Sequence, residues 1–168
     1  EQPLSKILVL GLIAGKAVRD YVAANKALPP SEETLSVKAR IALALPITEY
    51  MSHRHAYAAA FKSHVHTVTV RNFTEAITVK IKFEDVQVIA EGASAQYAIT
   101  DKGEPLAKLM LADVRKRGMS LTGVSAADVL AAKHTVGIDV GEGTVNFPVF
   151  THGRFNADAS RTFNEGYG

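Results

Sequence analysis

The residues best suited to chemistry lie near the C-terminal end of the sequence, from Asp139 to Thr144 (DVGEGT). A carboxylate, Asp139, closes an apolar run, and Gly141 and Gly143 flank Glu142 in the turn that follows. Glycines let backbone N–H groups approach and point at a phosphate without an intervening side chain. A carboxylate beside such a turn can hold the hydrated cation that neutralises the phosphate. The pattern therefore indicates a phosphate site, although Glu-Gly is also a good dipeptide for an ordinary hairpin turn.

The segments around this turn have the composition of strands. Thr135–Val140 and Thr144–Phe150 are apolar runs on either side of it, and a further short segment follows His152-Gly153. Apolar runs bounded by glycine turns are typical of strands joined in antiparallel hairpins. We therefore expect a hairpin with the turn at its tip and a third strand after it.

Upstream of the hairpin, helical and strand patterns alternate. Helices are expected at Leu4–Lys26, Met51–Ser63, Ala93–Thr100, Leu106–Arg117 and from Ser125 to about Lys133, and strands at Ser36–Leu45, His64–Arg71, Thr74–Phe83 and Asp85–Ala90. The first helix is apolar nearly all round and is expected to be largely buried. Pro46–Tyr50 closes the first strand, and the alternation in the next two predicts a polar-faced antiparallel hairpin. The order of elements predicts an α/β fold with a mixed sheet and flanking helices.

Composition limits the class of protein. A hydrophobic fraction of 47% and a charged fraction of 21% over 168 residues are typical of a soluble globular protein. The formal net charge is +2 and no basic cluster is larger than Arg115-Lys116-Arg117, so no direct contact with nucleic acid is expected. The absence of cysteine excludes disulfides and thiolate metal sites and fits a cytoplasmic protein. The longest apolar run, Ile7–Gly15, is too short to span a bilayer.

Four histidines form two His-x-His pairs, His53 with His55 and His64 with His66. On a strand, His64 and His66 share one face, and imidazoles at that spacing can bind Zn²⁺ or Ni²⁺. His53 and His55 lie on different sides of a helix. The alternative for all four is an exposed polar position without a ligand.

Three segments, in this order along the chain, resemble the actin-like ATPases: LALPITEY (Leu43–Tyr50), VQVIAEGASAQYAI (Val86–Ile99) and GIDVGEGTVNFPVF (Gly137–Phe150). Within that superfamily the bacterial ParM-type plasmid-segregation proteins are the most similar, because a Leu-Pro-Leu-Thr-Glu-Tyr segment follows a core strand in them. Residues 153–168 resemble the third strand of the family and the glycine before its next helix. The resemblance implies part of a ribonuclease-H-like, actin-like ATPase fold.

The resemblance also implies roles for individual residues. Asp139 matches the acid that holds magnesium through water, and Gly141–Thr144 matches the second phosphate loop of the family. Glu91 matches the position that orients the attacking water in the segregation proteins, which is reasonable because attack on a γ-phosphate needs a positioned water more than a strong base. The alternative for Glu91 is a solvated carboxylate at the end of a strand. The sequence departs from the ParM-type pattern at Glu142 and Gly143, which replace Gly-Thr, and at Asn146, which replaces a second Asp.

The resemblance sets an expected domain organisation. Residues 1–100 would form part of domain I, with a small β-hairpin subdomain at 64–83. Residues 101–133 would form a helical connection, longer than the family's, and residues 134–168 the opening hairpin of domain II. The family's first phosphate loop and its adenine-binding glycines have no counterpart, so the chain is expected to cover the middle of such a protein and to be inactive alone.

The function implied by the resemblance is ATP binding with Mg²⁺ in a protein that polymerises and moves plasmid DNA. Its partners would be further copies of itself and a DNA-binding adaptor, with neither a membrane nor nucleic acid bound directly. ATP hydrolysis would determine how long a filament remains stable. One alternative is a phosphotransferase related to sugar or acetate kinases, which share the Asp-x-Gly turn. Another is an actin-like scaffold that binds without hydrolysis, for which the departures at Glu142, Gly143 and Asn146 are the only support.

Overall fold

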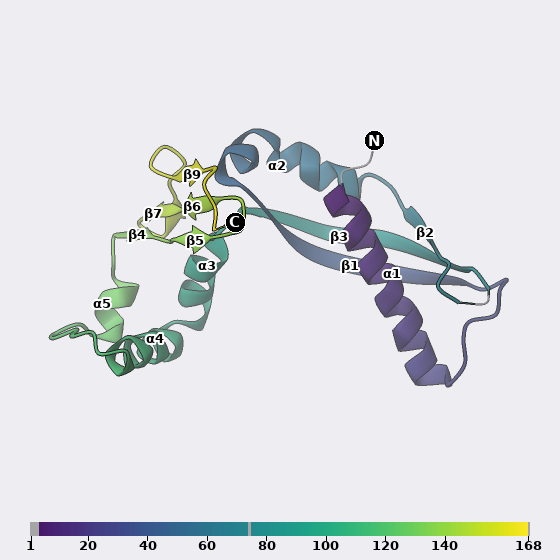
Figure 1. Cartoon of the computed structure of the whole chain (residues 1–168), viewed down its shortest axis with the longest axis horizontal. Coiled ribbons are helices and arrows are strands. Elements are labelled where there is room, and N and C mark those ends of the chain that lie inside the picture. The colour runs from purple at the N-terminus through teal and green to yellow at the C-terminus, as the bar shows by residue number, and fades with distance from the viewer. Residues whose placement is uncertain (1–3, 74, 168) are drawn as a thin grey trace. The chain divides into compact units, whose positions relative to one another are not determined.

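The computed structural model describes residues 4–73 and 75–167, so residues 1–3, 74 and 168 of the expected elements lie outside the described part (Figure 1). The helices are α1 (Leu4–Asn25), α2 (Ile47–Lys62), α3 (Ala93–Lys102), α4 (Glu104–Lys116) and α5 (Ala126–Leu130). The strands are β1 (Thr34–Leu45), β2 (His66–Val70), β3 (Ile77–Ala90), β4 (His134–Val136), β5 (Asp139–Val140), β6 (Val145–Phe147), β7 (Val149–Thr151), β8 (Arg154–Phe155) and β9 (Arg161–Phe163). The predicted α/β class is confirmed.

The chain divides into two compact units. Unit 1 consists of Glu1–Leu43 and His55–Gln87, and unit 2 of Ala44–Arg54 and Val88–Gly168. The two long strands β1 and β3 and the helix α2 contribute residues to both units. Within the described ranges, no helix combines the length and the apolar composition that crossing a membrane requires.

Unit 1 is built on the sheet β1-β3-β2. β2 and β3 form the predicted antiparallel hairpin, with Val68 opposite Val79. At the other end of β3, the Glu91 N–H donates to the Leu45 carbonyl at 2.8 Å, so the C-terminal ends of β1 and β3 meet and these strands run parallel. The sheet is therefore mixed, as the order of elements predicts.

β3 is one strand, where the sequence predicted two, Thr74–Phe83 and Asp85–Ala90. The buried positions alternate up to Phe83 and resume at Val86, so the phase of burial changes between them. At the change, the Asp85 carboxylate accepts a hydrogen bond from the Val86 N–H at 3.0 Å. The break in the hydrophobic period thus marks a local irregularity inside a continuous strand, not the end of one.

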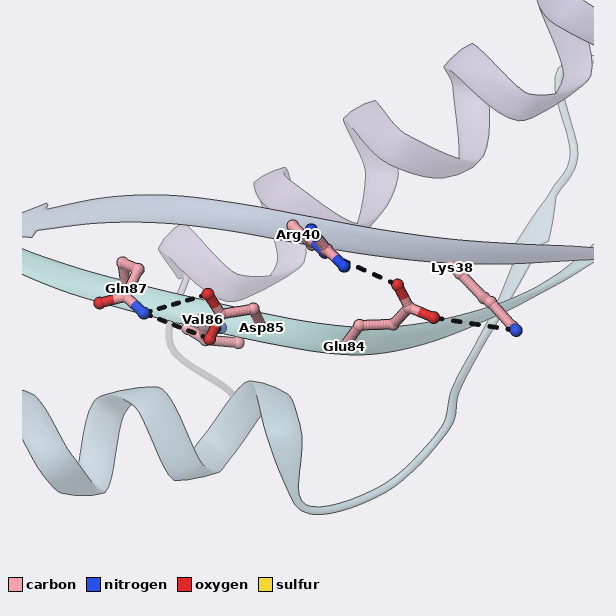
Figure 2. A network of polar contacts seen from close by, with 6 residues as sticks. All are labelled: Lys38, Arg40, Glu84, Asp85, Val86 and Gln87. Atoms are coloured by element: carbon pink, nitrogen blue, oxygen red, sulfur yellow. Dashed lines mark hydrogen bonds and ion pairs between the residues drawn. The ribbon is translucent and has the colours of Figure 1, made fainter.

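The two faces of the sheet in unit 1 differ in chemistry. On the face opposite its apolar residues, Glu84 of β3 points between Lys38 and Arg40 of β1, at 3.8 and 3.7 Å (Figure 2). These side chains are exposed, and such ion pairs contribute little to stability. Beside them, the Gln87 amide donates to Asp85 at 3.0 Å and, with the Val86 N–H, holds the pKa of the Asp85 carboxyl below its usual range. This face is a solvated, charged surface.

The helix α1 lies against the other elements of unit 1 with one side only (Figure 1). Ala14 and Val18 are buried, whereas Leu4, Leu8 and Leu12 are more than half exposed. The prediction of a largely buried helix is therefore wrong for the described chain. Apolar residues surround the helix, but within the described ranges only one of its faces has a packing partner.

His66 lies in the core of unit 1 and is 5% exposed, so the expectation of an exposed polar position is wrong for this histidine. Its Nε2 is 2.8 Å from the carbonyl oxygen of Phe61. Phe61 lies in the last turn of α2, where the carbonyl groups have no N–H partner within the helix. The ring of His64 lies 4.2 Å away, centroid to centroid, and the buried Lys6 lies over Phe61. Burial lowers the pKa of His66, and the Phe61 carbonyl opposes this shift while His64 and Lys6 add to it.

We predict that the folded state loses stability as the pH falls below 6.5, the ordinary pKa of histidine. Because the pKa of His66 is lower in the folded chain, the unfolded chain takes up the proton first, so this stability is present above 6.5 and is lost below it. His66→Gln keeps a donor for the Phe61 carbonyl but cannot titrate. Urea denaturation between pH 5 and 7.5 should show a weaker pH dependence for this variant than for His55→Gln, an exposed control. Equal pH dependence in both variants would contradict the prediction.

Unit 2 contains the predicted hairpin in a single register. Thr135 lies opposite Phe150 in β4 and β7, and Asp139 lies opposite Asn146 in β5 and β6. Between these pairs the Gly137 N–H donates to the Pro148 carbonyl at 2.9 Å. Pro148 has no N–H and cannot donate a hydrogen bond back to Gly137. The hydrogen-bond ladder is therefore interrupted here, but the strand register is the same on both sides. The third predicted strand is also present, as β8 and β9.

The start of α2 lies in unit 2 and differs from the prediction. The sequence predicts that Pro46–Tyr50 closes β1 and that the helix begins at Met51, but the helix begins at Ile47, directly after Pro46. Ile47 is 1% exposed and packs with Ala90, Ala93 and Phe150. Burying this side chain favours an immediate turn from strand to helix, which brings the first turn of α2 to the hairpin.

The helices α4 and α5 of unit 2 form a small separate cluster. Ser125 caps α5, and its side chain exchanges hydrogen bonds with the N–H and carboxylate of Asp128, as the capping-box pattern predicts. Ala107 and Leu111 of α4 pack against Ala126 of α5. This cluster supplies no residue to the site described below.

Candidate phosphate and metal site

Three side chains form a row across the hairpin sheet of unit 2. Asn146 of β6 is opposite Asp139 of β5 on one side and opposite Thr162 of β9 on the other. Residues directly opposite in an antiparallel pair point to the same face of the sheet. The row therefore places the predicted metal ligand Asp139 beside Asn146, which stands where the ParM-type pattern has its second acid.

Asn146 is the centre of a hydrogen-bond network. It is 1% exposed, and its Nδ2 donates to Oε2 of Glu91 at 2.8 Å. The Thr162 hydroxyl donates to its Oδ1 at 2.7 Å, and that hydroxyl accepts from the Ile47 N–H at 3.1 Å. The network thus joins the end of β3, the middle of the hairpin and the start of α2. It holds Glu91 at Asn146, which lies directly opposite Asp139 in the sheet.

The chain reaches this row through a close backbone approach at Gly92. Its φ of 75° is in the left-handed region, where glycine has no steric penalty. A Cβ atom added there would lie 2.9 Å from Cβ of Asp139 and 3.1 Å from Cγ of Pro148. Only glycine fits, so the residue directly after Glu91 packs its backbone against Asp139.

The turn at the tip of the hairpin has two residues, Glu142 and Gly143, closed by the Gly141 N–H donating to the Thr144 carbonyl at 2.8 Å. Neither glycine of the turn has a positive φ, so the backbone conformation does not require them. A side chain at Gly143 would meet nothing within 4 Å. In the described part of the chain no acceptor is found for the N–H of Glu142 or of Gly143. The turn therefore presents two open donors, as an anion site requires.

The segment after β9 covers one side of this turn. The Tyr167 N–H donates to the Gly141 carbonyl at 3.0 Å, and the backbone of Gly166 lies against Glu142. A side chain at Gly166 would collide with the Glu142 carbonyl. That side of the turn, at the Glu142 carbonyl and the Gly143 nitrogen, is thus occupied by the chain itself, and a ligand would have to reach the N–H groups from the other side.

Asp139 fits a hydrated cation better than a directly bound one. It is half-buried, and none of its carboxylate oxygens has a hydrogen-bond donor among the described residues. No cluster of three or more histidine, aspartate or glutamate side chains that could hold a metal exists within residues 4–73 and 75–167. Mg²⁺ usually keeps several waters and takes one or two carboxylates together with substrate phosphates. One free carboxylate beside a phosphate turn is consistent with that pattern.

The structure places the predicted site residues Glu91, Asp139 and Gly141–Thr144 in one compact unit. The two residues that link them, Asn146 and Thr162, were not predicted as site residues. Asn146 carried a signal, since it departs from the family pattern. Thr162 carried none, because its place opposite Asn146 depends on a strand register that no motif indicates. The His64–His66 pair belongs to unit 1 and is not part of this cluster.

No protein-family model matches the sequence, and no curated protein matches it. The comparison with solved structures found similarities at low identity. Bacillus thuringiensis ParM with ATP is 18% identical, with 94% of this chain and 35% of that chain covered at a TM-score of 0.49. An archaeal actin homolog is 16% identical, covering 79% and 33% at a TM-score of 0.49. The filament structure of AlfA from a B. subtilis plasmid is 14% identical, covering 91% and 40% at a TM-score of 0.48.

The chain spans between 33% and 40% of the length of the three structures.

Proposed function

We propose that this chain is part of an actin-like protein that binds ATP with Mg²⁺ and polymerises. The observation that carries the proposal is the row on the hairpin sheet, where Asn146 lies opposite Asp139 and donates to Glu91, next to a turn whose N–H groups have no described acceptor. Two separated carboxylates next to an anion-binding turn suit phosphoryl chemistry, in which catalysis consists mainly of positioning and charge stabilisation. An ordinary hairpin turn has no need of a buried amide that connects it to a carboxylate from another element.

Each site residue has a distinct part in this proposal. The N–H groups of Glu142 and Gly143 donate to the phosphates of the nucleotide, and Thr144 supports the turn from its base. Asp139 holds Mg²⁺ through water, and the metal neutralises charge on the phosphates. Glu91 has one carboxylate oxygen bound to Asn146, which leaves the other to orient a water for attack on the terminal phosphate.

We further propose that the full-length protein forms filaments in the cytoplasm for plasmid segregation, with a DNA-binding adaptor as its second partner. Support comes from the resemblance of the LALPITEY segment to the ParM-type proteins. Hydrolysis in such a filament shortens the lifetime of older protomers, so Glu91 would act on filament stability. The description of AlfA as a filament concerns that protein and motivates the assay below.

The test is light scattering of the full-length protein with ATP, ADP and no nucleotide, recorded together with phosphate release. The proposal predicts scattering that rises with ATP and phosphate release that follows it. Phosphate transfer to a sugar or acetate without scattering would favour the phosphotransferase. Scattering without any phosphate release would favour a scaffold.

Glu91→Ala should separate binding from hydrolysis. An interaction made chiefly in the transition state appears in the rate constant and not in the affinity. We expect phosphate release to slow by about tenfold or more, since positioned groups of this kind contribute at least that factor, while nucleotide affinity stays nearly unchanged and filaments persist longer. Unchanged phosphate release would remove Glu91 from the site. A lowered melting temperature, with binding and rate lost together, would make Glu91 structural.

A further inference from the structure

We infer that Asn146 and Thr162 are positioning residues that hold Glu91 for hydrolysis, an inference that rests on the proposed function. Asn146 contacts Glu91 directly, and Thr162 acts through Asn146. Neither residue touches a reacting atom in the proposed mechanism. Their role is to fix the direction in which the Glu91 carboxylate points.

The orientation of the Asn146 amide follows from its neighbours. The Ile47 N–H can only donate, so the Thr162 hydroxyl oxygen is its acceptor, and the Thr162 proton is free to donate elsewhere. That proton is directed at Asn146 at 2.7 Å, so the amide oxygen must face Thr162. The Asn146 NH₂ group therefore faces Glu91, and it also lies 3.4 Å from the Thr144 hydroxyl. The Ile47 N–H at the start of α2 thus determines, through Thr162, that the Asn146 NH₂ group donates to Glu91.

The amide at position 146 also has an electrostatic consequence. An aspartate there would place a second carboxylate within hydrogen-bond distance of Glu91. Two carboxylates so close share a proton, and the second of them ionises only at a higher pH. With Asn146, Glu91 has a neutral donor for one oxygen and no competitor for a proton. Asn146, the residue that departs from the family pattern, is therefore suited to keeping Glu91 as a hydrogen-bond acceptor.

Thr162→Val tests the orienting role, because valine matches threonine in shape but cannot donate to Asn146. In the full-length protein we expect phosphate release to slow by about tenfold, the effect of one hydrogen bond at a charged site, with the KM for ATP within about twofold. Thr162→Ser restores the hydroxyl and should restore the rate. Thr69→Val, at an exposed position of β2, removes a threonine hydroxyl away from the site and controls for the substitution itself.

Asn146→Asp adds a second measurement, the pH dependence of phosphate release, which would not change if Asn146 had a purely structural role. The shared proton should make phosphate release rise with pH between about 5 and 8, because the pair acts fully ionised only at the higher pH. The additional change Glu91→Gln should remove that rise, since the partner can then no longer ionise.

The outcomes separate the two levels of the proposal. A full-length wild-type protein without ATP hydrolysis would overturn both the proposed function and this inference. Wild-type hydrolysis with an unaffected Thr162→Val rate, or with the same pH profile in Asn146→Asp as in the wild type, would overturn the inference alone. A rate lost in Thr162→Val, restored in Thr162→Ser and unaltered in Thr69→Val supports it.

Discussion

Asp139→Ala in the full-length protein should reduce Mg²⁺-dependent ATP hydrolysis by at least about a hundredfold, because the loss of metal or transition-state positioning commonly costs ~3 kcal/mol. Asp139 is the acid at the end of β5, next to the turn with open donors, and no described residue donates to its carboxylate. Neither Glu91, which has one oxygen bound to Asn146, nor Glu142, which is exposed on the turn, occupies the position of Asp139 at the end of β5. Steady-state phosphate release over a range of Mg²⁺ concentrations measures the effect.

The same variant should fold normally. The carboxylate of Asp139 is half-buried and makes no hydrogen bond to a described donor, so its removal leaves no buried group unpaired. Asp101→Ala, an exposed aspartate of α3 paired only with its neighbour Lys102, is the matched control and should retain hydrolysis. Normal hydrolysis by Asp139→Ala would mean that the hairpin tip is a plain turn and that the resemblance to the actin-like ATPases misleads at this position.

Gly92→Ala should destabilise the chain by about 3 kcal/mol, because two costs combine. An alanine in the left-handed region costs about 1–2 kcal/mol, and overpacking at an occupied site costs about 1–3 kcal/mol more. The second cost applies at Gly92 because the new methyl group would lie 2.9 Å from Cβ of Asp139. The free energy of unfolding of the 168-residue chain in urea, followed by a probe in unit 2, measures the sum.

Gly118→Ala is the matched control for this prediction. Gly118 also has a positive φ, 83°, but a side chain there would meet nothing within 4 Å. It should therefore show only the conformational part, about 1–2 kcal/mol. Equal losses in the two variants would contradict the close approach of Gly92 to Asp139, and with it the juxtaposition of Glu91 and Asp139.

Local pattern predicted most of the elements, because their signals are contained in neighbouring residues. The capping box at Ser125 and the alternation in β2 are of this kind. The errors occurred where packing between distant segments decides the structure. Ile47 joins a helix because its side chain is buried against Phe150, and His66 is buried because α2 ends beside it. Neither contact leaves a trace in the local hydrophobic period.

The candidate site divides in the same way. Asp139, Glu91 and the turn could be predicted, because a short motif carries each of them. The link between them could not, since it depends on Asn146 lying opposite Thr162 and on the Ile47 N–H at the start of a helix that begins earlier than predicted. Motifs therefore identified the groups that we propose act on a ligand, and the strand register identified the groups that contact them.

The most direct test of the proposed site is a structure of the full-length protein with Mg²⁺ and a non-hydrolysable ATP analogue. We expect phosphate oxygens about 3 Å from the N–H groups of Glu142 and Gly143, a hydrated Mg²⁺ beside Asp139, and the terminal phosphate facing the free oxygen of Glu91. A nucleotide bound elsewhere, with the turn still in contact only with its own chain at Gly166 and Tyr167, would contradict the assignment of this hairpin as the phosphate site.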